Sequence, residues 1–136
     1  MSFFYEVDLQ VNHPDADPAD IVDGLALPAS RSWKAGDRRS TPKDTELPGN
    51  YRETYCVFRM GSGDDGALAN CLWDAVRLLQ PRRQYLNWLR DTGGRMNFYV
   101  GWTVGERGEV FDTSLLSEIA LLGIELGIEP FRVRQH

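Results

Sequence analysis

The sequence predicts an α+β fold, and three observations carry that prediction. Residues 3–12 and 95–104 alternate apolar and polar side chains, which is typical of strands with one buried face. Residues 67–80 place apolar side chains at helical spacing. The order strand, helix, strand recurs near both ends of the chain. We therefore expect a mostly antiparallel four- to five-stranded sheet with helices packed on one face. The expected arrangement is ferredoxin-like, or a variant with two pseudo-repeated β-α-β units.

The first strand is followed by a short helix. One side of the strand is apolar, and its residues are Phe3, Tyr5, Val7, Leu9 and Val11. Asp17 is a typical N-cap for the helix, and Pro18 fits its first turn. Gly24 lowers the helix propensity, so we expect the helix to be short.

Irregular structure is expected between this helix and the second long strand. Residues 28–50 are interrupted by proline and glycine, which favours turns. Within them we expect a short strand near 31–34 and a mobile loop at 40–50. Aromatic and β-branched residues then predict a strand at 51–60.

The remaining elements follow a loop at 61–66. In order they are helices at 67–80 and 82–91, a strand at 95–104, a helix at 113–122 and a strand at 124–131. The whole chain, residues 1–136, is expected to form one domain.

One face of the sheet should be free of helices. If the apolar sides of the strands face the helices, the opposite face carries Phe4, Glu6, Asp8, Gln10, Asn97, Tyr99, Thr103, Glu125 and Glu129. An antiparallel sheet can leave one face in water. We expect this acidic face to be solvated, with a partner-binding surface as the alternative.

Charge is unevenly distributed along the chain, whose net charge is −5. Residues 1–30 carry six acids and no Lys or Arg, whereas residues 31–52 carry six bases against three acids. The acidic total argues against general nucleic-acid binding. No apolar run is long enough to span a membrane, and the first residues do not resemble a signal peptide. The two cysteines, Cys56 and Cys71, fit a reducing compartment, so we expect a cytoplasmic protein.

Two motifs resemble ligand sites, but each has a simpler interpretation. Residues 61–66, GSGDDG, match G-x-G-x-x-G, yet Asp64 and Asp65 would repel a pyrophosphate. We interpret them as acids in the first turn of the following helix. Residues 13–20, HPDADPAD, have too few oxygen ligands for calcium and are interpreted as a capped helix start. No catalytic motif is present, so we expect no enzyme activity, catalytic residue, metal or cofactor.

The N-terminal strand and four later segments resemble a bacterial domain-of-unknown-function family, the one numbered 4279. The later segments are DPADIVDGLALP (17–28), WKAGD (33–37), LLQPRRQYLNWL (78–89) and LLSEIALLGIELGIEPF (115–131). The chain departs from the family at Pro130–Phe131, where an acidic–aromatic end is more usual. The resemblance implies a fold but no activity or site residues. Some small acidic bacterial proteins of this kind act as immunity partners of secreted toxins, an analogy that would imply a basic effector as the partner.

The basic segment is the most promising functional stretch. Its candidate partner- or anion-binding residues are Arg31, Trp33, Lys34, Asp37, Arg38 and Arg39. Arginine makes planar, bidentate contacts, and Trp33 lies in a polar context, whereas Trp73, Trp88 and Trp102 are expected in the core. We expect a non-enzymatic protein-binding module. The alternative is an anion or small-ligand site at 31–39, and an exposed edge strand would allow a homodimer.

Overall fold

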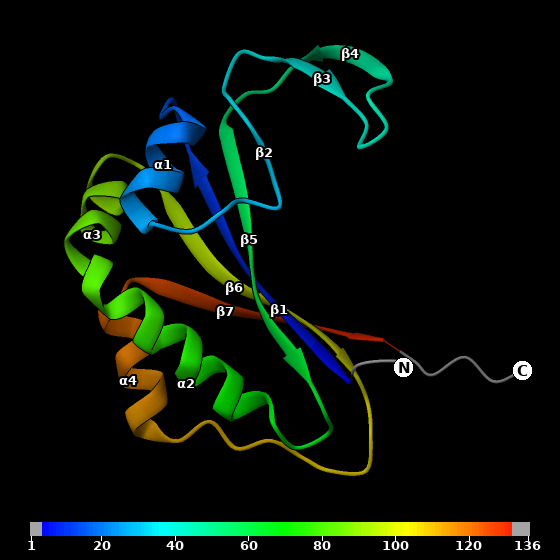
Figure 1. Ribbon diagram of the computed structural model, residues 1–136, viewed down its shortest axis with the longest axis vertical. Helices are drawn as coiled ribbons and strands as arrows, with labels where there is room; N and C mark the ends of the chain where they lie inside the picture. The colour runs from blue at the N-terminus through cyan, green and yellow to red at the C-terminus, as the bar shows by residue number, and fades with distance from the viewer. Residues whose placement is uncertain (1–3, 132–136) are drawn as a thin grey trace, which may run out of the picture.

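A computed structural model describes residues 4–131 (Figure 1). The strands are β1 (Tyr5–His13), β2 (Arg31–Trp33), β3 (Arg38–Ser40), β4 (Glu46–Asn50), β5 (Thr54–Gly63), β6 (Arg95–Thr103) and β7 (Ile124–Phe131). The helices are α1 (Pro18–Leu25), α2 (Leu68–Leu79), a 3-10 turn (Gln80–Arg82), α3 (Arg83–Asp91) and α4 (Thr113–Leu121). The elements follow the predicted order, with a two-stranded hairpin in addition.

Five strands form the main sheet, in the order β2-β5-β1-β6-β7. β1 lies at the centre and pairs antiparallel with both β5 and β6, while β2 pairs antiparallel with β5. β7 pairs parallel with β6. The prediction of a mostly antiparallel sheet is therefore confirmed.

The two strand–helix–strand units that look alike in the sequence are connected differently. β6 and β7 are neighbours in the sheet, joined through α4. β1 and β2 are joined through α1 but have β5 between them. Similar local patterns can thus serve different connections, because the pattern reports burial and not strand order.

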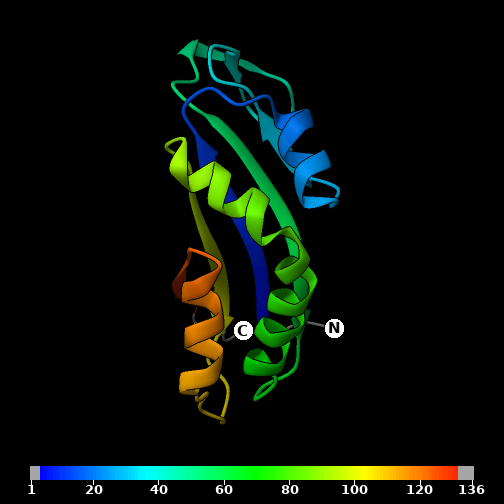
Figure 2. The same ribbon diagram turned by 90° about the vertical axis from the view of Figure 1, so that its left-hand side faces the viewer.

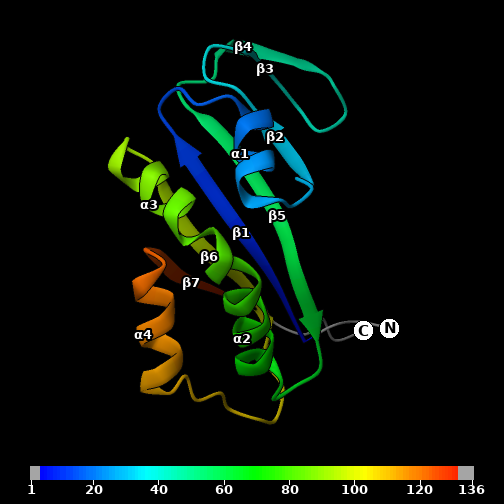
Figure 3. The same ribbon diagram turned by 60° about the vertical axis from the view of Figure 1, so that its left-hand side comes forward.

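The helices cover one face of the sheet (Figures 2 and 3). Alternate residues of β1 point into this layer, and Val7, Leu9 and Val11 are fully buried. One side of α2 meets them, with Leu72 and Val76 also fully buried. The one-sided core therefore leaves the other face of the sheet free of helices.

The predicted start of α1 is confirmed, and Gly24 has a packing role. The Asp17 side chain accepts a hydrogen bond from the Ala19 N–H at 3.0 Å, with Pro18 as the first helical residue. A Cβ built on Gly24 would lie 2.4 Å from Cζ of Tyr85. The glycine therefore allows the α3 tyrosine ring to approach α1 closely.

The start of α2 corrects our interpretation of the GSGDDG motif. The helix begins at Leu68, so Asp64 and Asp65 precede its first turn. The Asp65 carboxylate instead accepts hydrogen bonds from two N–H groups of a distant loop, at Glu106 (2.8 Å) and Arg107 (3.0 Å). From the same loop, Glu109 accepts a hydrogen bond from the Ala69 N–H at 3.1 Å.

The aromatic core differs from expectation at one tryptophan. Trp73 and Trp102 pack partly buried against the core, but Trp88 is 48% exposed and lies against His13 and Tyr85. Both cysteines are free thiols.

Residues 38–50, predicted to be mainly irregular, form the β3–β4 hairpin. In Figure 1 the hairpin lies beyond one end of the main sheet and extends away from the helical layer. Its strands are short and charged, so they lack the apolar alternation that would have identified them.

Candidate functional site

The base of the hairpin is built around Trp33. Trp33 ends β2 and lies opposite Tyr55 of β5, so both side chains lie on the helix-free face of the sheet. The Trp33 ring centroid is 4.6 Å from that of Tyr55 and 4.2 Å from that of Tyr51, with an interplanar angle of 12° for the second pair. The Arg31 guanidinium carbon is 5.0 Å from the Trp33 ring centroid. We call Arg31, Trp33, Tyr51 and Tyr55 the aromatic–arginine cluster.

Backbone hydrogen bonds hold this cluster in place. The Tyr51 N–H donates to the Asp37 carbonyl, and the Tyr51 carbonyl accepts from the Gly36 N–H, both at 2.8 Å. The Tyr51 hydroxyl donates to the Ser40 carbonyl at 3.0 Å and accepts from its N–H at 3.2 Å. Tyr51 therefore connects both strands of the hairpin to the Trp33 ring.

The turn after β2 depends on one glycine and one aspartate. Gly36 has φ +90°, a conformation that favours glycine. The Asp37 carboxylate accepts a hydrogen bond from the Lys34 N–H at 3.1 Å. The centre of the basic segment is therefore an ordered turn.

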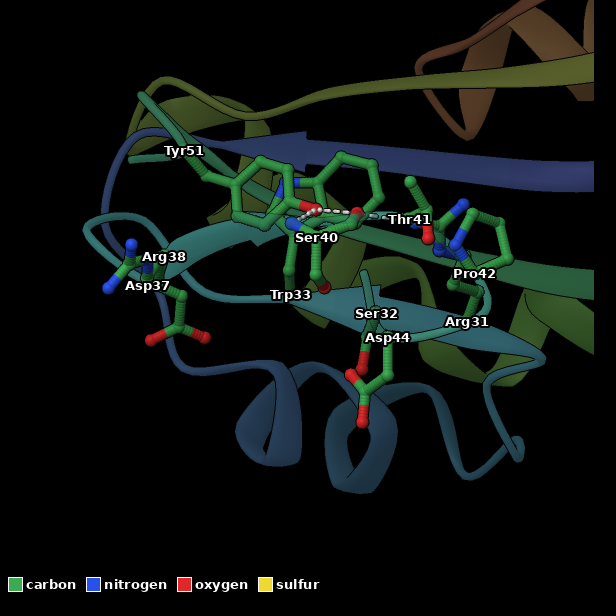
Figure 4. Close-up of a pocket in the computed structure, with 10 residues that line it drawn as sticks. All are labelled: Arg31, Ser32, Trp33, Asp37, Arg38, Ser40, Thr41, Pro42, Asp44 and Tyr51. Atoms are coloured by element: carbon green, nitrogen blue, oxygen red, sulfur yellow. Dashed lines mark hydrogen bonds between the residues drawn. The ribbon is translucent and has the colours of Figure 1, made fainter. Parts of the chain in front are cut away.

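A cavity of about 280 Å³ lies between β2 and the hairpin (Figure 4). Its lining residues are Arg31, Ser32, Trp33, Asp37, Arg38, Ser40, Thr41, Pro42, Asp44 and Tyr51. Figure 4 shows the Tyr51 ring lying over that of Trp33, with the Tyr51 hydroxyl directed at Ser40. The lining contains two arginines and two aspartates, so its formal charge is balanced.

The structure separates the six candidate residues into two groups. Arg31, Trp33, Asp37 and Arg38 line the cavity. Lys34 and Arg39 do not line it. The Lys34 ammonium lies 3.9 Å from the Asp17 carboxylate, and Arg39 donates to the Pro48 carbonyl at 3.3 Å.

The sequence analysis missed Tyr51 and Tyr55 as members of this site. Both were assigned only to a strand, since their aromatic character predicts β structure. Tyr55 is separated from Tyr51 by four positions and from Trp33 by a whole hairpin, so only the strand register could bring the three together.

The helix-free face of the sheet is polar and half-buried near this cluster. Burial raises the pKa of the Tyr55 phenol, and the nearby Asp8 carboxylate raises it further. Burial also raises the pKa of Asp8, although Arg59 opposes that shift. The Arg59 Nε atom lies 3.1 Å from Oδ1 of Asp8, without the geometry of a hydrogen bond, and its Nη1 lies 3.6 Å from Glu6.

Residues 4–131 contain neither a cluster of metal ligands nor a membrane-spanning helix. No three His, Cys, Asp or Glu side chains in this part of the chain are grouped to hold a metal ion. None of the helices described is long and apolar enough to cross a membrane.

No protein-family model, curated protein or solved structure matches the chain. Membership of the family numbered 4279 therefore stays a prediction from the N-terminal strand and the four later segments.

Proposed function

We propose that the protein is a non-enzymatic binding module, with the aromatic–arginine cluster and the hairpin as its contact surface. The observation that carries the proposal is a set of Trp, Tyr and Arg side chains, partly exposed, at the base of a projecting hairpin. These residue types dominate the binding energy of protein interfaces. Because the ring stacking and the backbone hydrogen bonds hold the cluster in place, little side-chain entropy would be lost on binding.

The basic segment and the acidic helix-free face of the sheet suit partners of opposite charge. Residues 31–52, which contain β2 as well as the hairpin, carry a net charge of +3, six bases against three acids, so this segment complements an acidic patch. A basic effector, the partner of a toxin-immunity protein, would instead suit the helix-free face that carries Glu6, Glu125 and Glu129.

We also propose a ferredoxin-like core for the fold. The four strands β2-β5-β1-β6 support this assignment, since each strand pair joined by helices encloses one other strand. The α4–β7 unit then extends the core by one parallel strand.

The binding proposal is tested by affinity capture from an extract of the native host. The wild-type chain should retain a defined partner, while Trp33→Ala and Arg38→Glu should lose it. Arg38 is exposed, and its one ion pair within residues 4–131 is with exposed Glu46 at 3.0 Å, so its replacement should leave the fold intact. Arg77→Glu, a matched charge reversal on α2, is the control. Equal capture by all four proteins, or none by the wild type, would contradict the proposal.

A second candidate function is small-ligand binding in the cavity. The volume of about 280 Å³ and the two arginines favour it. Because Asp37 and Asp44 balance these arginines, a ligand with both anionic and cationic groups fits better than sulfate. A thermal-shift panel of amino acids, nucleotides and inorganic anions tests this, with Arg31→Ala/Arg38→Ala expected to abolish any shift. No shift with any of these compounds would exclude the site.

A further inference from the structure

The outer edge of β7 is a long, uncovered strand edge. The other edge strand of the main sheet, β2, has 3 residues, whereas β7 has 8. β7 pairs with β6 alone, and no other segment within residues 4–131 hydrogen-bonds to its backbone. Alternate residues of an edge strand direct both N–H and C=O outward, so this edge presents a row of unpaired groups that can pair with another strand up to Pro130, which has no N–H.

The helix-free side of this edge is acidic. Glu125 and Glu129 are exposed there, and neither forms an ion pair within the part of the chain described. Their cross-strand neighbours on β6 are the uncharged Asn97 and Gly101. Both carboxylates are therefore available to a cationic group from outside.

A polar hollow of about 280 Å³ opens between these strands. Its lining includes Glu125, Asn97, Gly127 and Arg95, whose guanidinium lies 3.1 Å from the Glu53 carboxylate. A Cβ built on Gly127 would have no atom closer than 3.9 Å, so the space above this glycine is open. The hollow could accommodate the aliphatic stem of a lysine or arginine whose charge reaches Glu125.

The helix side of the same edge is apolar. Ile128 of β7 is 42% exposed, and Leu116 of α4 is 45% exposed. Gln80 donates to Glu118 at 3.0 Å, which turns the Glu118 side of α4 toward α2. By helical periodicity, Leu116 lies on the opposite side, toward the open edge.

We propose that the β7 edge accepts an extended segment of another protein with alternating basic and apolar residues, added as a sixth strand. Backbone hydrogen bonds would supply affinity and the side-chain alternation specificity. The basic residues would meet Glu125 and Glu129, and the apolar ones Ile128 and Leu116. This surface is separate from the aromatic–arginine cluster and goes beyond the function proposed above.

Charge argues against a second copy as the occupant. In an antiparallel pairing of two β7 edges, the helix-free faces of both copies become continuous. Glu125 and Glu129 of one copy would then face the same glutamates of the other, and like charges across a strand pair are destabilising. A basic segment would instead place positive charges opposite Glu125 and Glu129, and opposite charges across a strand pair are stabilising.

The test uses a capped synthetic peptide of alternating lysine and valine, with the length of β7, 8 residues. Fluorescence anisotropy should detect binding to the wild-type protein. Affinity for Glu125→Lys/Glu129→Lys should fall roughly tenfold or more, because two attractive charge pairs become repulsive. A peptide of alternating glutamate and valine, and a lysine–valine peptide N-methylated at alternate residues, should both fail to bind. Trp33→Ala should bind like the wild type, which separates this result from the hairpin proposal.

The matched control is Asp20→Lys/Asp23→Lys, which changes the net charge equally at exposed sites on α1, a helix that packs against β5 and not against β7. It should bind nearly as well as the wild type. The proposal is overturned if the wild type does not bind, if the control loses as much affinity, or if the N-methylated peptide binds equally. A wild-type dimer in sedimentation analysis that Glu125→Lys/Glu129→Lys alters would also overturn it, because a second copy would then fill the edge.

Discussion

Replacing Gly24 with alanine should destabilise the protein, although α-helix propensity favours the opposite result. An alanine in a helix interior is favoured over glycine by about 1 kcal/mol. The new methyl group, however, would lie 2.4–2.5 Å from three ring carbons of Tyr85. Such an overlap is far inside van der Waals contact, so Tyr85 must move.

Two interactions of Tyr85 would be lost when it moves. Its hydroxyl donates to the Asp20 carbonyl at 3.2 Å, and its ring lies 5.6 Å from that of Trp88. A hydrogen bond contributes roughly 1 kcal/mol and an aromatic pair a similar amount. Set against the propensity gain of about 1 kcal/mol, the net loss in the free energy of unfolding should be about 1 kcal/mol.

Urea denaturation measures this change, and the Tyr85→Ala background reveals its cause. With the ring removed, adding Gly24→Ala should stabilise the protein by about 1 kcal/mol, the full propensity gain. Ser117→Ala, at an exposed position inside α4, is the control for propensity alone. If Gly24→Ala stabilises the wild type as much as it stabilises Tyr85→Ala, the packing argument is wrong.

Two further predictions concern the core and the start of α2. Burial raises the pKa of Tyr5 from 10.0 to about 12 and that of Tyr85 equally, so the native state retains protons that the unfolded chain loses. The free energy of unfolding should therefore fall as pH rises from 10 to about 12, and Tyr5→Phe should flatten that fall in urea titrations. Glu109→Gln should lower stability by about 0.5–1 kcal/mol in thermal unfolding, since it removes a charge at a helix N-terminus. Glu106→Gln should have no such effect, and equal losses would refute the capping role.

Sequence reasoning predicted the elements whose signal is local. The alternation of β1 identified its buried side, and Asp17 followed by Pro18 identified the start of α1. Both signals depend on neighbours within a few residues, so they predict the element independently of the tertiary fold.

The contacts that were not predicted join residues far apart in the sequence. Glu109 caps α2 at Ala69, a contact across 40 residues that no spacing in the sequence indicates. Gly24 was predicted only to weaken α1, because its contact with Tyr85 depends on how α3 crosses the first helix.

The candidate site shows the same division. Its basic and tryptophan-containing segment was recognised from composition, but the cavity also needs Tyr51, which the hairpin brings back over Trp33. The sequence did not show which residues of neighbouring strands lie opposite one another. It would have been available from the sequence only if β3 and β4 had shown an apolar alternation.

The central position of β1 has a consequence for how the chain is made. Tyr5 lies opposite Gly63 on one side and Trp102 on the other. Because synthesis proceeds from the N-terminus, the middle strand of the sheet leaves the ribosome first and meets its second partner only after residue 102 has followed. Until α2 has been synthesised, Val7, Leu9 and Val11 lack the helix that covers them and can bind chaperones or other nascent chains. Translational stalling before β6 should therefore leave a chain that cannot complete its sheet.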